Sequence, residues 1–173
     1  MINDMYSLAK KMELIDWGMI FLGAKGSPAG RLLASDISEF ACDELAKLDM
    51  DDPLLTDVSE AAFCTEITSE IISNLEIICD KKNINMQLSE RKWRYVALYI
   101  LLLNGLPDDY VYGLLKLNEF WSLWGDSGDS PNIVQGVGNN LSPSEYYSEE
   151  TYCLLMKSHQ DWLDKEIKQL RLI

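Results

Sequence analysis

The stretch Tyr95-Val-Ala-Leu-Tyr-Ile-Leu-Leu-Leu103 decides the fold class of this chain. It is apolar over nine consecutive residues. At helical spacing one face carries Trp93, Val96, Ala97, Ile100 and Leu101, and Leu98, Leu102 and Leu103 fill the others. A helix that is apolar on nearly every side is typical of the centre of a helical domain. The run is about half as long as a membrane span requires, so we predict a buried central helix over 90–103.

The segments on both sides of this helix have the spacing of amphipathic helices. We expect helices over 13–24, 35–48, 53–63, 65–82 and 107–124, and a last one from Ser142 or Ser148 to about 170. The chain has 173 residues, 47% hydrophobic and 25% charged, which fits one globular domain that needs no cross-links. The prediction is therefore an all-α fold, a single globular helical domain over 1–173 with five to seven helices around the buried central helix.

Residues 125–142 are rich in Gly, Asn, Asp and Ser and lack a regular apolar spacing. A loop of this length is uncommon inside a compact domain. We expect a long Gly/Asn/Ser-rich loop before the last helix, either mobile or folded into a short β-hairpin around Ile133, Val134 and Val137.

The net charge of −13 is concentrated in the two flanks of the chain. Residues 1–60 hold 12 acids and 5 bases, 61–105 hold 5 of each, and 106–173 hold 11 acids and 5 bases. Such a field repels nucleic acid and anionic lipid and attracts a cationic protein. We expect a basic protein partner, no nucleic acid and no membrane, although solubility alone is an alternative reason for the charge.

The four cysteines are widely spaced and the start of the chain has no basic region followed by an apolar one. A cytoplasmic protein with free thiols is the expectation. No motif of catalysis, metal binding or nucleotide binding is present, so no catalytic residue, metal site or cofactor is predicted. Glu66 and Glu70, four residues apart, are interpreted as a solvated helix face. The sequence leaves open whether the chain is an enzyme and favours the view that it is not.

A basic cluster, Arg91, Lys92 and Arg94, opens the central helix. Cations in a first turn oppose the helix dipole, so a compensating group is expected nearby. An internal acidic partner from residues 36–60 is the favoured explanation, and a bound anion is the alternative. Together with His159, the only histidine, the cluster gives the alternative function of a small soluble hydrolase or anion-binding enzyme.

An acidic stretch over residues 36–60 contains nine acids and only one base, Lys47. A solvated helix face explains part of this charge, but it does not explain the concentration of like charges, which costs self-repulsion, so a binding role is the alternative. We predict a surface for a basic partner protein. Its residues are Asp36, Glu39, Asp43, Asp49, Asp51, Asp52 and Asp57.

Three short motifs resemble a family of small uncharacterised bacterial proteins, a domain of unknown function. They are Leu14-x-x-Trp17, Leu45-x-x-Leu48 and Glu90-Arg-Lys-Trp-Arg-Tyr95, and the resemblance covers about residues 1–125. It implies an all-helical bacterial cytoplasmic protein of the immunity type, and no functional residue is carried over. With the acidic stretch, this suggests a protein-binding module that acts as an acidic immunity-type inhibitor of a cationic bacterial toxin, such as a nuclease, by electrostatic blocking.

Overall fold

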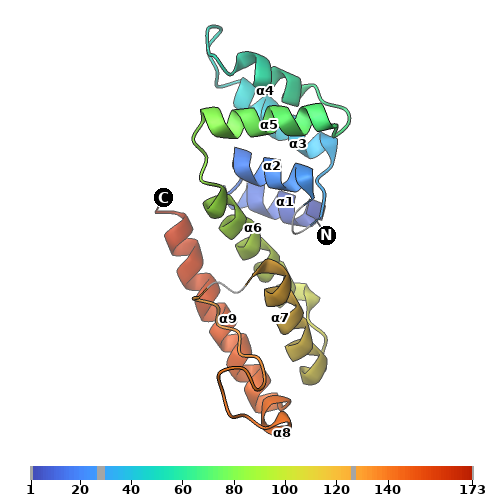
Figure 1. Ribbon diagram of the computed structural model, residues 1–173, viewed down its shortest axis with the longest axis vertical. Coiled ribbons are helices and arrows are strands. Elements are labelled where there is room, and N and C mark those ends of the chain that lie inside the picture. Colours follow the sequence, from blue (N-terminus) through green and yellow to red (C-terminus); the bar gives the residue numbers. More distant parts are fainter. Residues whose placement is uncertain (1, 27–29, 126–127, 173) are drawn as a thin grey trace. The chain divides into compact units, whose positions relative to one another are not determined.

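The computed structural model describes residues 2–26, 30–125 and 128–172, and all regular structure in them is helical (Figure 1). In chain order the elements are α1 (Ile2–Lys11), α2 (Trp17–Lys25), α3 (Ala34–Leu45), α4 (Leu55–Ala62), α5 (Ser69–Lys81), α6 (Met86–Ile100), a π-helical segment (Leu101–Gly105), α7 (Tyr110–Trp124), α8 (Pro143–Tyr146) and α9 (Glu149–Leu170). The predicted all-α fold is confirmed.

The nine α-helices of the described residues exceed the five to seven expected, for two reasons. The first helix, α1, has only a short apolar stripe and is not among the predicted helices. The expected last helix is two helices, because Ser142 caps α8 and Ser148 caps α9 through their side-chain oxygens. Both expected start positions are therefore helix N-caps.

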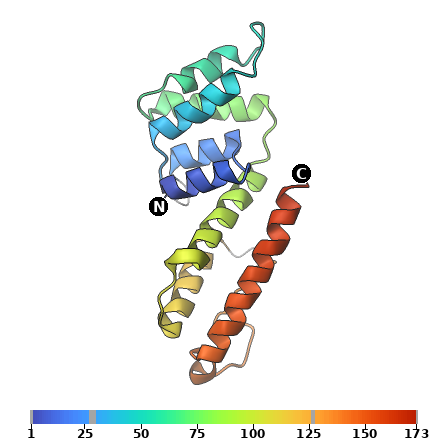
Figure 2. The same cartoon turned by 180° about the vertical axis from the view of Figure 1, so that it is seen from behind.

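The chain divides into two compact units, residues 1–96 and 97–173, and α6 runs across the division. The prediction of a single domain over 1–173 stays a prediction. Within the first unit, α3 packs against α4, α4 against α5, and α5 against α2. Figures 1 and 2 show α1 and α2 side by side, with α3, α4 and α5 grouped next to them. The fully buried core side chains include Ile20, Ile37, Val58, Leu75 and Ile78.

The first half of α6 is anchored in this unit by Trp93, whose side chain is 1% exposed and whose Nε1–H donates a 2.8 Å hydrogen bond to the carbonyl oxygen of Met19. The expected burial of Trp93 is confirmed. The predicted 90–103 segment is helical, but its last residues belong to the π-helical segment, where Leu103 is exposed. The prediction of a buried helix is therefore correct for its first part, but the predicted helix is longer than the buried segment.

Asp16 joins α2 to α6. It is the N-cap of α2, where Oδ1 accepts the backbone N–H of Met19 at 2.8 Å, and the same oxygen accepts the hydroxyl of Ser89 at 2.8 Å. Ser89 is fully buried inside α6. Gly18 lets the two helices approach, since a Cβ there would overlap Oγ of Ser89.

In the second unit α7 packs against α9. A core cluster of Leu114, Tyr146 and Leu155 is fully buried, and half-buried side chains from the neighbouring segments pack against it. This core holds the segment between α7 and α8 in place, because the hydroxyl of Tyr146 donates to the carbonyl oxygen of Ile133 at 2.8 Å.

The described part of the 125–142 loop, residues 128–142, has no strand, so the expected β-hairpin is absent from it. Two glycines in the left-handed region, Gly136 and Gly138, turn the backbone there. The side-chain amide of Asn139 closes the turn by donating to the carbonyl oxygens of Val134 and Val137 at 2.8 and 2.9 Å. Hydrogen bonds from the side-chain amide of Asn139, rather than backbone hydrogen bonds between two strands, therefore stabilise this turn.

Candidate functional site

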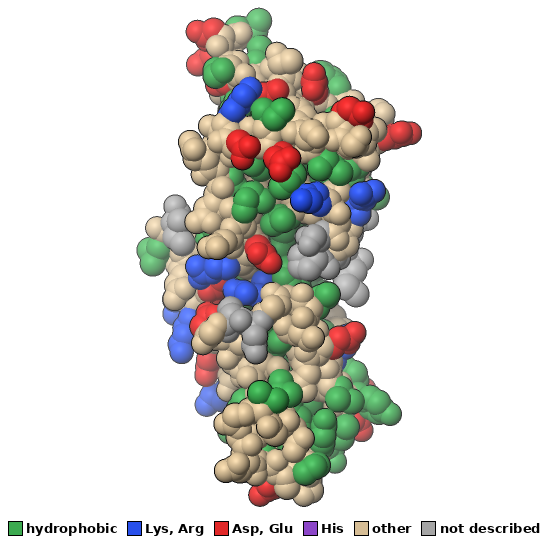
Figure 3. All heavy atoms as spheres, in the orientation of Figure 1, with side chains coloured by type: hydrophobic (Ala, Val, Ile, Leu, Met, Phe, Trp, Pro, Cys, Tyr) green, Lys and Arg blue, Asp and Glu red, His purple; other side chains and the backbone are tan. Residues whose placement is uncertain are grey.

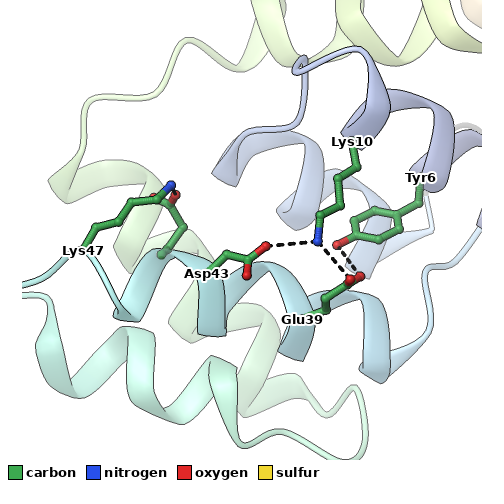
Figure 4. Close-up of polar contacts among 6 residues, drawn as sticks. Tyr6, Lys10, Glu39, Asp43 and Lys47 are labelled. Atoms are coloured by element: carbon green, nitrogen blue, oxygen red, sulfur yellow. Dashed lines mark hydrogen bonds and ion pairs between the residues drawn. The ribbon is translucent and has the colours of Figure 1, made fainter.

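Part of the acidic stretch is neutralised by a lysine of another helix. Nζ of Lys10, on α1, lies 2.9 Å from Oε1 of Glu39 and 3.0 Å from Oδ2 of Asp43, both on α3 (Figure 4). The hydroxyl of Tyr6 also donates to Glu39, at 3.2 Å. Burial and the neighbouring Glu39 carboxylate raise the pKa of Tyr6 well above its usual value, so the phenol remains a donor. Glu39 and Asp43 thus connect α3 to α1 through ion pairs with Lys10.

Three further predicted binding residues also have structural partners. Asp57 on α4 pairs with Lys81 on α5 at 2.6 Å. Asp36 accepts the backbone N–H of Leu33 at the start of α3, and Asp52 accepts that of Leu54 before α4. Five of the seven predicted binding residues therefore stabilise the first unit.

Asp49 and Asp51 are different, because both are exposed and neither has a basic partner among the described residues. They flank Met50, whose side chain is 91% exposed. We call these three residues, in the segment between α3 and α4, the acidic tip. Acidic and apolar side chains lie together over this segment in Figure 3. The Met50 side chain therefore lies outside the core, in solvent between two carboxylates.

A groove lies between α4 and α5. It has a volume of about 440 Å³ and is lined by Asp57 and Glu60 from α4 and by Ser69, Glu70, Ser73, Asn74 and Ile77 from α5. We call it the α4–α5 groove. Phe63, one helical turn beyond Glu60, ends α4 and is 77% exposed.

Sequence reasoning missed Met50, Glu60, Phe63 and Glu70 as surface candidates. The interpretation of Glu66 and Glu70 as one helix face is wrong, because α5 begins at Ser69 and Glu66 precedes its N-cap. An apolar residue inside an acidic run, as at Met50, was the signal available in the sequence.

Lys92 of the basic cluster has its acidic partner outside the acidic stretch. Nζ of Lys92 lies 2.6 Å from Oδ2 of Asp16, and both side chains are mostly buried. The expectation of a compensating acid from residues 36–60 is therefore wrong for Lys92, because α2, not α3 or α4, faces this side of α6. Arg94 is buried and Arg91 half-buried, and each has a partner within the protein. All three belong to the first unit, whereas His159 belongs to the second.

His159 is fully buried on α9, and both of its ring nitrogens are engaged. Nε1–H of Trp121 donates to Nε2 at 2.8 Å, and Nδ1 lies 2.6 Å from the carbonyl oxygen of Leu155. An indole only donates, so Nε2 is the acceptor and Nδ1 carries the proton. Burial lowers the pKa of His159, which keeps this neutral tautomer. No ring nitrogen remains for a substrate or a metal.

The described residues contain no group of three or more His, Cys, Asp or Glu side chains arranged to hold a metal ion. The four cysteines are unpaired, with Cys42 and Cys153 exposed, Cys64 half-buried and Cys79 buried. The expectation of free thiols agrees with this arrangement.

Residues 6–167 match the sequence family described as "Uncharacterized protein conserved in bacteria (DUF2247)". The chain belongs to this family. The resemblance seen over residues 1–125 is thereby confirmed, and the match extends further, through the loop and into α9. Neither the curated proteins nor the solved structures contain a match to this member of DUF2247.

Within the described ranges of this DUF2247 protein, no helix is both long and apolar enough to span a membrane.

Proposed function

We propose that this protein is a protein-binding module that recognises a cationic partner protein through its acidic tip. The observation that carries the proposal is Met50, 91% exposed between Asp49 and Asp51, two carboxylates without a basic partner among the described residues. The carboxylates attract the partner over a distance of about a Debye length. The Met50 side chain, which is flexible and polarisable, then supplies apolar contact area.

For a bacterial protein, this chemistry fits an immunity-type inhibitor of a cationic toxin. A toxin that acts on an anionic substrate, such as a nuclease, has a basic cleft. Carboxylates placed in that cleft exclude the substrate, and steering makes their association fast. The acids of the tip are suited to this because the fold does not need them, whereas Glu39, Asp43 and Asp57 are held by lysines.

Solubility alone accounts less well for this surface. A surface that serves only solubility carries charge and keeps large apolar side chains few and scattered. Here Met50, inside the acidic stretch, and Phe63, three residues after it at the C-terminal end of α4, are both more than three-quarters exposed. Exposed apolar side chains among charges are typical of interface anchors with a polar rim.

The alternative of a hydrolase or anion-binding enzyme receives no support from the groups it would use. Lys92 is paired with Asp16, and His159 has both ring nitrogens in hydrogen bonds. A general base needs a free nitrogen within reach of a substrate proton. We therefore propose the binding function alone.

Affinity capture in an extract of a bacterium that encodes the protein tests the proposal. The bait is the wild-type protein, and the matched bait carries Asp49→Asn, Met50→Ser and Asp51→Asn. We expect the wild-type bait to retain a basic protein at low ionic strength and to release it when the Debye length falls to about 3 Å near 1 M salt. The triple variant should retain less of it. Retention of the same proteins by both baits would contradict the proposal.

A further inference from the structure

The α4–α5 groove combines an apolar wall with carboxylates that lack a cationic partner. Ile77 forms the apolar part of the lining and is 45% exposed. Asp57, at one side, is already paired with Lys81 at 2.6 Å. Glu60 and Glu70 have no basic partner within the described ranges, so they carry the net negative charge of the groove.

Hydroxyl groups hold Glu70 in place. Oγ of Ser69 lies 3.3 Å from Oε2 of Glu70, and hydrogen bonds from Thr68 and Ser69 lower the pKa of its carboxyl. These hydroxyl groups lie beside the carboxylate in the folded chain and favour its ionised form. Orienting a group in advance reduces the entropy lost on binding. Asn74, buried at the base, is fixed by donating to the carbonyl oxygen of Asp57 at 2.7 Å.

An exposed apolar side chain follows the groove residue Glu60 along α4. Phe63 follows Glu60 by one helical turn and ends α4, and its side chain is 77% exposed. Figure 3 shows acidic side chains beside apolar ones over α5 as well. A ligand for this surface therefore needs a cation next to an apolar side chain, not a cation alone.

We infer that the α4–α5 groove binds an arginine of the cationic partner, with a neighbouring apolar side chain of the same segment packed on Phe63. The guanidinium lies between Glu60 and Glu70, and its aliphatic stem lies against Ile77. Arginine fits better than lysine because its planar fork donates to two carboxylates and a hydroxyl such as that of Ser73 at once. The inference rests on the proposed function, since it names the chemistry of that partner.

The test uses the full chain and a defined probe, an acetylated eight-residue peptide amide with one Arg-Leu pair among Gly and Ser. Two matched peptides replace the arginine by citrulline, which has nearly the same shape and no charge, or the leucine by alanine. Binding is followed by amide chemical shifts in ¹H–¹⁵N spectra. We expect saturable shifts at Glu60, Glu70, Ser73 and Ile77 with the Arg-Leu peptide, weaker binding of the alanine peptide and none of the citrulline peptide.

Two protein variants complete the design. Glu60→Gln with Glu70→Gln should weaken the Arg-Leu peptide about tenfold, as expected when charge-assisted hydrogen bonds are lost. Glu66→Gln with Glu76→Gln makes the same change in charge outside the groove lining and should leave binding unchanged. Three results would each overturn the inference. The citrulline peptide could bind as tightly as the Arg-Leu peptide, the two double variants could lose the same affinity, or the chemical shifts could change at all exposed acids.

The outcome separates this inference from the proposed function. If the peptide does not bind at the groove but binding of a captured partner still depends on Asp49 and Asp51, only the inference about the groove is overturned. Binding of the peptide at the groove without any basic partner in the capture experiment overturns the proposed function and leaves an arginine-binding site.

Discussion

The indole Nε1–H of Trp121, on α7, donates a 2.8 Å hydrogen bond to Nε2 of His159, on α9. This bond fixes the tautomer of the only histidine in the chain and links the two helices through their buried faces. Protonation of Nε2 would place two donors against each other. The pair is therefore a structural element of the second unit that tolerates only the neutral imidazole.

The free energy of unfolding should consequently fall as the pH falls below the ordinary His pKa of 6.5. The folded chain keeps His159 neutral, so the unfolded chain takes up the proton first and is favoured at acidic pH. Well above pH 6.5 His159 is neutral in both states, and its contribution is complete. Urea unfolding between about pH 5.5 and 7.5 measures this slope.

The matched variant for this slope is His159→Gln, which cannot titrate. Its free energy of unfolding should be lower throughout and nearly flat over the same range of pH. Since the chain has one histidine, an unchanged slope in the variant would show that the pH dependence has another origin.

Asp16→Ala should destabilise the protein by about 2–4 kcal/mol. The change removes a helix N-cap and leaves the mostly buried Lys92 and the hydroxyl of Ser89 without their acceptor. Asp16→Asn retains an oxygen for the cap and should cost less. Thermal unfolding of the two variants checks the order, and equal losses would mean that the retained cap oxygen contributes nothing and that the charge of Asp16 accounts for the whole effect.

Gly18→Ala should cost about 1–3 kcal/mol in spite of the better helix propensity of alanine. The new Cβ would overlap Oγ of Ser89 and lie 2.8 Å from Cγ2 of Ile84, so α2 and α6 would have to separate. Gly128→Ala is the control, because a Cβ there meets nothing within 4 Å. A stable Gly18→Ala protein would indicate that the two helices are packed less closely than described.

The thiols should differ in reactivity in the native protein. The exposed Cys42 and Cys153 should react quickly with a disulfide reagent, and Cys64 more slowly. Cys79 should react last, because burial raises its pKa to about 12 and the thiolate is the reactive form. Unfolded, non-reduced protein should titrate as four thiols, and a lower number would reveal a disulfide.

The helices were largely predictable because their signals are local. Apolar spacing located α3, α4, α5 and the buried half of α6, and side-chain caps at Ser142 and Ser148 marked α8 and α9. The short β-hairpin, one of the two alternatives for the 125–142 loop, is absent from residues 128–142, where the side chain of Asn139 closes the turn near Gly136. Such a bond depends on one rotamer rather than on a repeated pattern.

The candidate site was only partly predictable, because charge is visible in a sequence and pairing is not. The partners of Glu39 and Asp43 lie 29 and 33 residues away, at Lys10. Asp16 meets Lys92 across 76 residues. Only the folded chain separates the acids that hold helices together from Asp49 and Asp51, which face solvent.

The most direct test of the proposed function is the association rate of the captured basic partner with the Asp49→Asn, Asp51→Asn protein. We expect a rate about three- to tenfold below wild type at low salt, with a flatter salt dependence, because steering depends on local charge. The melting temperature should stay unchanged, since exposed carboxylates contribute little to stability.

The control Asp161→Asn, Asp164→Asn alters the net charge equally on α9 and should associate like wild type. An unchanged rate for the tip variant, or a large drop in its melting temperature with unchanged binding, would contradict the account.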